Sequence, residues 1–170
     1  LEMRWSWIDF ERCRYEIPKL KNGRPHIVHL SAPAMVELHS LLEQQAAAPC
    51  PFVFSTTSRT SATGVSKAKT RIDALITTAR IEMGNSLPFE HWVLHDLRRA
   101  QATALAEAGY DEGVVDRIQN QVAASSRASA VAGVYNKAQK LPDRAAALDA
   151  WSSMVTCENS KVVNLFPAVS

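Results

Sequence analysis

The pattern of apolar and polar positions predicts strands at the start of this chain and helices over the rest. Aromatic and β-branched residues gather in three short segments, residues 5–12, 14–20 and 24–30, as is typical of strands. The last two segments are joined at Asn22-Gly23, a pair that tolerates the positive φ of a tight hairpin turn. We therefore expect a small three-stranded antiparallel sheet near the N-terminus, with Lys21 at the tip of its hairpin.

Helical periodicity begins after Ser31, a suitable N-cap that has Pro33 in the first turn of a helix extending to about Ala48. Residues 52–54 predict a brief buried extended segment, and residues 55–66 predict an exposed loop. Apolar stripes predict further helices over residues 67–83, 95–108 and 111–118, a small helix that carries Tyr135, and a last helix from Leu141-Pro142 with Leu148 and Trp151 on its apolar side. The predicted fold class is therefore α+β and mostly helical.

Length and composition predict one domain. A chain of 170 residues that is 46% apolar can bury one sizeable core, which we assign to residues 1–155. In the tail, residues 156–170, the segment 161–166 alternates like a strand that could join a sheet edge in its own protomer or in a neighbour. A disordered terminus is the alternative. No apolar run approaches the roughly 20 residues that span a bilayer, so we expect a cytoplasmic protein without a membrane partner.

Bulk charge does not by itself indicate a nucleic-acid partner, because 19 basic residues face 17 acidic ones. The distribution is more informative. Residues 59–99 carry seven basic and four acidic residues, and acids concentrate after Glu107. We expect a basic face on the first two thirds of the chain. Three widely separated cysteines predict neither a disulfide framework nor a metal site; they are Cys13, Cys50 and Cys157.

Two blocks carry residue types suited to attack on a phosphodiester. His95 and Arg98 are one helical turn apart, and Tyr135 follows in a predicted small helix. A tyrosine with a pKa of about 10 is mostly protonated at neutral pH, so it needs a positive site to become a useful nucleophile. An arginine fork also suits the charge that grows on phosphate oxygens.

The order of these blocks resembles the catalytic domain of phage-type integrases, the tyrosine recombinases. The blocks that resemble the family are, in order, the hairpin Lys21, Leu94-His95-Asp96-Leu97-Arg98-Arg99, and Gly133-Val134-Tyr135-Asn136. Further segments that match the family lie at residues 3–9, 21–28, 52–54 and 145–151. Together the matches cover about residues 3–155, which makes the resemblance specific.

The resemblance implies site-specific DNA recombination, as in prophage integration and excision, through a 3′-phosphotyrosyl link made by Tyr135. Arg98 would clamp the phosphate, and His95 would donate to it or help move the tyrosine proton. Lys21 would protonate the leaving 5′-oxygen. Neither ATP, metal nor another cofactor is implied. The implied partners are double-stranded attachment-site DNA, further copies in a tetramer on that DNA, and an accessory directionality factor.

Two departures from the family pattern weaken the expected activity. The family's first catalytic arginine precedes the block Met3-Arg4-Trp5, whereas this sequence starts at Leu1, so we expect the first helices of the domain to be missing. Gln121 stands where the family has a histidine or tryptophan donor. Its amide can donate a hydrogen bond but cannot carry charge. We expect the chain as given to cleave poorly or not at all.

Each candidate also has a purely structural interpretation. Tyr135 could be a half-buried helix tyrosine, His95 could pack under Trp92, and Lys21 could be a solvated turn residue. Arg98 and Arg99 are adjacent, so they cannot share a helix face, and the motif favours Arg98. The alternative functions are a DNA-binding remnant without covalent capture, a type IB topoisomerase-like enzyme, and a helical interaction module.

Overall fold

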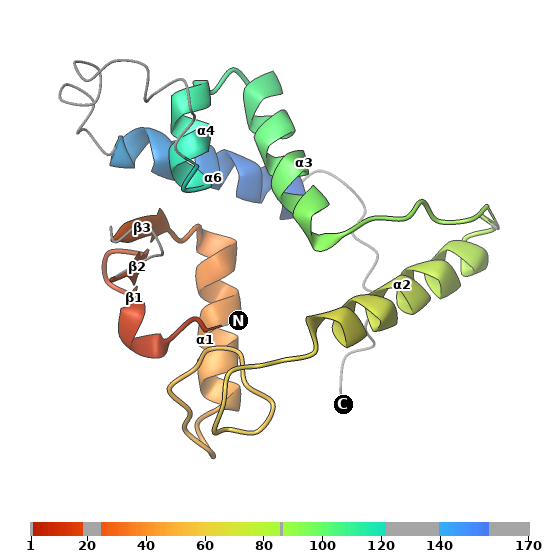
Figure 1. Cartoon of the computed structure of the whole chain (residues 1–170), viewed down its shortest axis with the longest axis horizontal. Helices are drawn as coiled ribbons and strands as arrows, with labels where there is room; N and C mark the ends of the chain where they lie inside the picture. The colour runs from red at the N-terminus through yellow and green to blue at the C-terminus, as the bar shows by residue number, and fades with distance from the viewer. Residues whose placement is uncertain (1, 19–24, 86, 122–139, 157–170) are drawn as a thin grey trace.

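The computed structural model describes residues 2–18, 25–85, 87–121 and 140–156 (Figure 1). The described elements are the 3-10 turn η1 (Trp5–Trp7), the strands β1 (Ile8–Asp9), β2 (Arg14–Ile17) and β3 (His26–His29), and the helices α1 (Ala32–Gln44), α2 (Val65–Glu82), α3 (Leu94–Glu107), α4 (Glu112–Ile118) and α6 (Leu141–Thr156). The predicted fold class, α+β and mostly helical, is confirmed. Within the described ranges, no helix combines the length and the apolar character needed to cross a membrane.

The strands form the predicted three-stranded antiparallel sheet, in the order β1-β2-β3. Strands β2 and β3 pair with Arg14 opposite His29 and Ile17 opposite His26. The hairpin tip with Lys21 lies outside the described residues, as does the predicted small helix around Tyr135.

The first predicted strand, residues 5–12, is wrong over most of its length. Trp5–Trp7 forms a 3-10 turn, and only Ile8–Asp9 pairs with β2. The cause is a change of pairing partner along the segment. The Trp5 N–H donates to the Pro51 carbonyl at 3.2 Å, so the chain turns between its contact with that distant segment and its contact with β2.

The buried extended segment predicted at residues 52–54 forms only in part: Phe52 pairs with Arg4 as an isolated bridge, residues 53 and 54 lie in a bend, and only Val53 is fully buried. Val53 is 1% exposed, and its N–H donates to the Met3 carbonyl at 2.9 Å. Gln45 Nε2 donates to the Val53 carbonyl at 2.7 Å, while Gln45 Oε1 accepts the Trp5 Nε1–H at 3.0 Å. One glutamine that follows α1 therefore ties this segment to the start of the chain.

The helix boundaries lie close to those expected. Helix α1 begins directly after Ser31 but ends at Gln44 rather than near Ala48. Beyond it the chain tightens into turns, in which the Ala46 N–H donates to the Glu43 carbonyl and the Ala48 N–H to the Gln45 carbonyl, each at 3.1 Å. Helices α2 and α3 are followed by glycines with φ of 78° and 84°, Gly84 and Gly109. Glycine adopts this left-handed conformation without steric cost, which suits the end of a helix.

The core of the described chain lies where α3, α4 and α6 meet (Figure 1). Its buried side chains are Leu105, Val114, Val115, Ile118 and Ala147. Leu148 and Trp151 of α6 pack against them, which confirms the predicted apolar side of the last helix. The three helices thus form the packed body against which β3 and α1 also lie.

Helix α6 joins the sheet to this core. Arg144 is 5% exposed, and its guanidinium donates to the carbonyl of Ile27 in β3. His29, at the end of the same strand, places Nε2 2.9 Å from a carboxylate oxygen of Asp149. These contacts hold β3 against the helical body.

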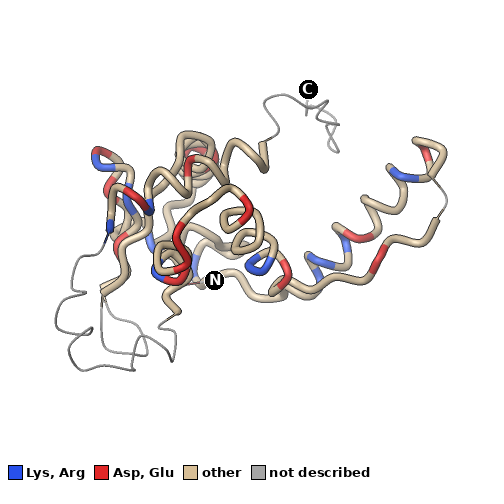
Figure 2. The backbone as a smooth tube through the Cα atoms, turned by 90° about the horizontal axis from the view of Figure 1, so that it is seen from above, with Lys and Arg blue, Asp and Glu red and all other residues tan. Residues whose placement is uncertain are grey.

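Helix α2 and the segment that returns from it extend away from this body (Figure 1); we call residues 65–85 and 87–93 the α2 arm. No residue of α2 is buried. Two cation–π contacts link the helix to the return segment: Lys69 Nζ lies 4.9 Å from the Trp92 ring centre, and the Arg80 guanidinium lies 5.6 Å from that of Phe89. Basic and acidic residues are interspersed along the arm (Figure 2). Its exposed large apolar side chains are Ile72, Leu75, Ile81, Met83, Leu87, Phe89 and Val93.

Candidate active site at the junction of helices α3 and α4

The start of α3 is stabilised by Asp96. Its carboxylate accepts the Val93 N–H at 2.9 Å, which satisfies a backbone donor at the helix start. The same carboxylate lies 3.0 Å from Nη1 of Arg99. The hydrogen bond from Val93, followed by that from Arg99, holds the pKa of Asp96 below its ordinary value against the opposing effect of desolvation. Asp96 and Arg99 therefore have structural roles in the exposed first turns of the helix.

Arg98 points to the other side of the helix, toward the end of α4. Its Nε–H donates to Oε1 of Gln119 at 3.1 Å, and its Nη2 donates to the main-chain carbonyl of the same residue. In return, Gln119 Nε2 donates to the Arg98 carbonyl at 2.7 Å. Arg98 is half-buried, whereas the Arg99 side chain is 71% exposed. Successive helix residues diverge by about 100°, and the structure gives Arg98 the inward position.

The end of α4 has the geometry of a Schellman motif. Asn120 has a φ of 51°, its N–H donates to the Arg117 carbonyl at 3.2 Å, and the Gln121 N–H donates to the Asp116 carbonyl at 2.8 Å. Asparagine tolerates this left-handed conformation better than most residues. The Gln119 carbonyl is then one of the last in the helix, and a positive guanidinium is a favourable partner for it.

His95 lies one turn before Arg98 and is exposed. Within the described ranges its imidazole has no hydrogen-bond partner. The alternative that His95 packs under Trp92 is not what the structure shows, because His95 is exposed and, among the described residues, no ring contact joins it to Trp92. His95 is thus open to solvent on the helix that carries Arg98.

The predicted residues are only partly brought together. The described structure places Arg98 and His95 on α3. Gln121 is exposed and lies two residues beyond Gln119, the partner of Arg98. Lys21 and Tyr135 lie outside the described residues. Their roles therefore stay predictions.

The sheet reaches the same end of α4 through His26. Its Nε2 lies 3.2 Å from the Ile118 carbonyl, the residue before Gln119. Burial lowers the pKa of His26, the positive Arg144 lowers it further, and the hydrogen bond to Ile118 opposes both. The strand that leads out of the predicted Lys21 hairpin is thus fastened beside the Arg98 contact.

Sequence reasoning missed the importance of Gln119 and His26. The family pattern instead points to Gln121, two residues beyond Gln119, as the donor. Both contacts join residues far apart in the chain, 21 positions for Gln119 with Arg98 and 92 for His26 with Ile118, so no local pattern could have indicated them.

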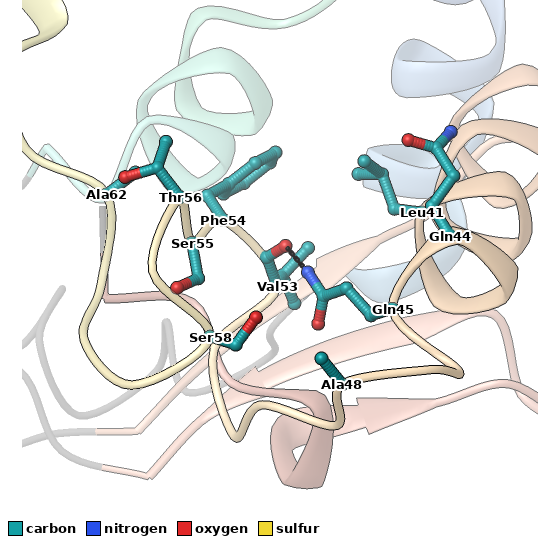
Figure 3. A pocket seen from close by; sticks show the side chains of 10 residues that line it. All are labelled: Leu41, Gln44, Gln45, Ala48, Val53, Phe54, Ser55, Thr56, Ser58 and Ala62. Carbon is teal, nitrogen blue, oxygen red and sulfur yellow. Dashed lines mark hydrogen bonds between the residues drawn. The ribbon is translucent and has the colours of Figure 1, made fainter.

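A separate hollow of about 410 Å³ lies between the end of α1 and the loop that follows residue 53 (Figure 3). Figure 3 shows Gln45 reaching across it to Val53, opposite the hydroxyls of Ser55 and Ser58. Its lining holds amide, hydroxyl and apolar side chains but no acid, base or thiol. The hollow therefore offers no general acid or base, and no group that could activate its hydroxyls as nucleophiles.

A mostly helical α+β domain that holds an arginine at a helix junction, with a histidine one turn before it, fits the class of tyrosine-recombinase catalytic domains. The family model for the phage integrase family matches residues 1–139. The chain therefore belongs to the phage integrase family, whose members are DNA-binding tyrosine recombinases. No curated protein and no solved structure matches the chain.

Proposed function

We propose that residues 1–155 are the catalytic domain of a site-specific recombinase that cuts and rejoins DNA in prophage integration or excision. Residues 156–170 are the tail, which packs on its own protomer or on a neighbour in a tetramer on DNA. The proposed substrate is a double-stranded attachment site. An accessory directionality factor would select between integration and excision.

In the proposed reaction the Tyr135 hydroxyl oxygen attacks a backbone phosphorus. The bond from phosphorus to the tyrosine oxygen forms as the bond to the 5′-oxygen breaks, so the number of phosphoester bonds is unchanged. The tyrosine loses its proton, and the 5′-oxygen gains one from Lys21. An ammonium suits that transfer because a guanidinium does not give up its proton. Attack by the 5′-hydroxyl of a second strand reverses the step.

The observation that supports the proposal best is the position of Arg98. Two of its five N–H groups are taken by Gln119, and among the described residues nothing engages its Nη1. That edge is open for a phosphate, whose transition state gathers charge on the nonbridging oxygens. His95 would donate to the same phosphate or take the tyrosine proton, and Gln121 would add an amide donor.

The test uses a pool of random-sequence duplexes in which sulfur replaces the bridging 5′-oxygen. A thiolate leaves without a proton and rejoins poorly, so cleavage accumulates as a covalent protein–DNA adduct. We expect such an adduct, with any native residues that precede Leu1 included in the protein. Tyr135→Phe should abolish it. Lys21→Ala should react with the sulfur substrate but not with its oxygen counterpart, whereas Arg98→Ala should react with neither.

The same assay separates the alternative functions. Salt-dependent duplex binding without any adduct would support a DNA-binding remnant. Relaxation of a supercoiled plasmid with no sequence enrichment in the captured DNA would support a topoisomerase-like enzyme. If Gln121 limits catalysis, Gln121→His should increase the yield of adduct, because histidine can carry the charge that an amide cannot.

A further inference from the structure

The contact between Arg98 and Gln119 is reciprocal and involves both the side chain and the main chain of each residue. Oε1 and the main-chain oxygen of Gln119 accept from Arg98, and Nε2 of Gln119 donates back to the Arg98 carbonyl at 2.7 Å. We propose that Gln119 is a positioning residue that aims the Arg98 guanidinium at the DNA phosphate. This inference rests on the proposed function.

The geometry leaves one edge of the guanidinium for a ligand. Nε–H and Nη2 lie on the same side of the group, and Gln119 occupies that side with two oxygens. The end of the group keeps a pair of N–H donors, one on Nη1 and one on Nη2, which can hold two phosphate oxygens at once. Rotation of the guanidinium would break both contacts with Gln119, so the open edge has a defined direction.

An amide is the side chain that this site requires. The arginine Nε–H can only donate and the Arg98 carbonyl can only accept, so the partner must offer an acceptor and a donor side by side. Glutamate has no donor for the carbonyl, and an apolar side chain has neither. Gln101 Oε1 lies 3.5 Å from Gln119 Nε2, at the limit of a hydrogen bond, and makes a weaker second contact.

Gln119 is itself held in place by the fold. It directly follows Ile118, which is 8% exposed in the core, and precedes Asn120, whose left-handed conformation closes α4. His26 holds the Ile118 carbonyl from the side of the sheet. The amide that orients Arg98 is therefore anchored next to the buried core of the described chain.

The test compares Gln119→Met, which has a similar length but no polar group, with Gln101→Met in the same cluster. In single-turnover reactions on the sulfur-substituted duplexes, Gln119→Met should form adduct roughly 10- to 100-fold more slowly than the unchanged chain, as expected for a misdirected catalytic group. Gln101→Met should change the rate less than about threefold. Affinity for an uncleavable duplex, measured with Tyr135→Phe also present, should stay within about threefold, because the charge of Arg98 is retained.

A second measurement reports on the contact itself. The Nε–H resonance of Arg98 in a ¹⁵N spectrum should be protected from exchange with water in the unchanged chain and in Gln101→Met, and lose that protection in Gln119→Met. Gln119→Leu also lacks both polar groups, so it should lose the protected resonance and form adduct as slowly as Gln119→Met. It replaces Gln119→Met in the test if the methionine variant does not fold.

The outcomes distinguish the two proposals. Adduct formation at an unchanged rate in Gln119→Met, with the resonance lost, would overturn the positioning role and leave the recombinase proposal intact. No adduct with the unchanged chain, while the resonance is protected, would overturn both.

Discussion

Helices α4 and α2 differ in a way that their lengths do not suggest. Helix α4 has 7 residues, three of which are buried: Val114, Val115 and Ile118. Helix α2 has 18 residues and buries none of them. Helical stability in proteins comes mostly from the packing of an apolar face, so the short helix is the firmly held one. The candidate active site uses this packed region, since Arg98 is held by the residue that follows α4.

The largest expected contrast is between two leucine truncations. Leu105→Ala in the core, where the side chain is 0% exposed, should lower the free energy of unfolding by about 3 kcal/mol because it leaves a cavity. Leu75→Ala on the α2 arm, where the residue is 39% exposed, should lower it by less than about 1 kcal/mol. Urea denaturation followed by circular dichroism measures both. Equal losses would mean that the arm is packed as tightly as the core.

Amide hydrogen exchange should also distinguish the α2 arm from the core. The backbone amides of α2 should open with a free energy at least about 2 kcal/mol below that of α3 and α4, because segments with few buried contacts open locally. The measurement is native-state exchange by mass spectrometry. Protection of α2 equal to that of α3 would contradict the comparison.

The residues that close α2 and α4 give a matched pair of smaller changes. Gly84 and Asn120 have positive φ of 78° and 51°, which alanine adopts only with strain. Asn120→Ala should cost about 1 kcal/mol of global stability, and Asn120→Gly should be neutral or stabilising. Gly84→Ala should instead speed amide hydrogen exchange, and only within the α2 arm. A loss of global stability with Gly84→Ala would show that the arm unfolds together with the core.

The smallest expected effect is a dependence of stability on pH through His26. Its pKa in the folded protein lies below the ordinary value of about 6.5, so near that pH the unfolded chain binds more protons than the folded one. The contribution of His26 to the free energy of unfolding should therefore be complete above about pH 6.5. It should be lost as the pH falls toward the pKa of His26 in the folded protein. Urea midpoints measured between pH 5 and 7.5 test this. The His26→Gln variant should lose the part of the pH dependence that His26 causes. A pH dependence equal to that of the unchanged chain would show that His26 is not its source.

Local sequence patterns predicted the helices well because each carries its own signals. Ser31, Gly84 and Gly109 stand at or next to the ends expected of them. The same reasoning failed for residues 5–12, where the chain exchanges one pairing partner for another. Strand pairing depends on distant segments, and the aromatic and β-branched residues of 5–12 contained no information about Pro51.

The site shows the same division between local and distant information. Helix spacing required that Arg98 and Arg99 face different directions, and the capping role of Asp96 is a contact over three residues. The sequence could select Arg98 only through its resemblance to a family. It also directed attention to Gln121, while the residue that holds Arg98 is Gln119.

The sequence by itself determined the class of the fold, the positions of the helices that the structure describes, and the set of residue types suited to phosphodiester chemistry. Only the tertiary structure decided which arginine turns inward, which glutamine holds it, and that α2 stands apart from the core. The physical reason is the range of the interactions. Capping and helix periodicity act within a few residues, whereas the burial and hydrogen bonding that orient Arg98 arise when α3 and α4 pack together.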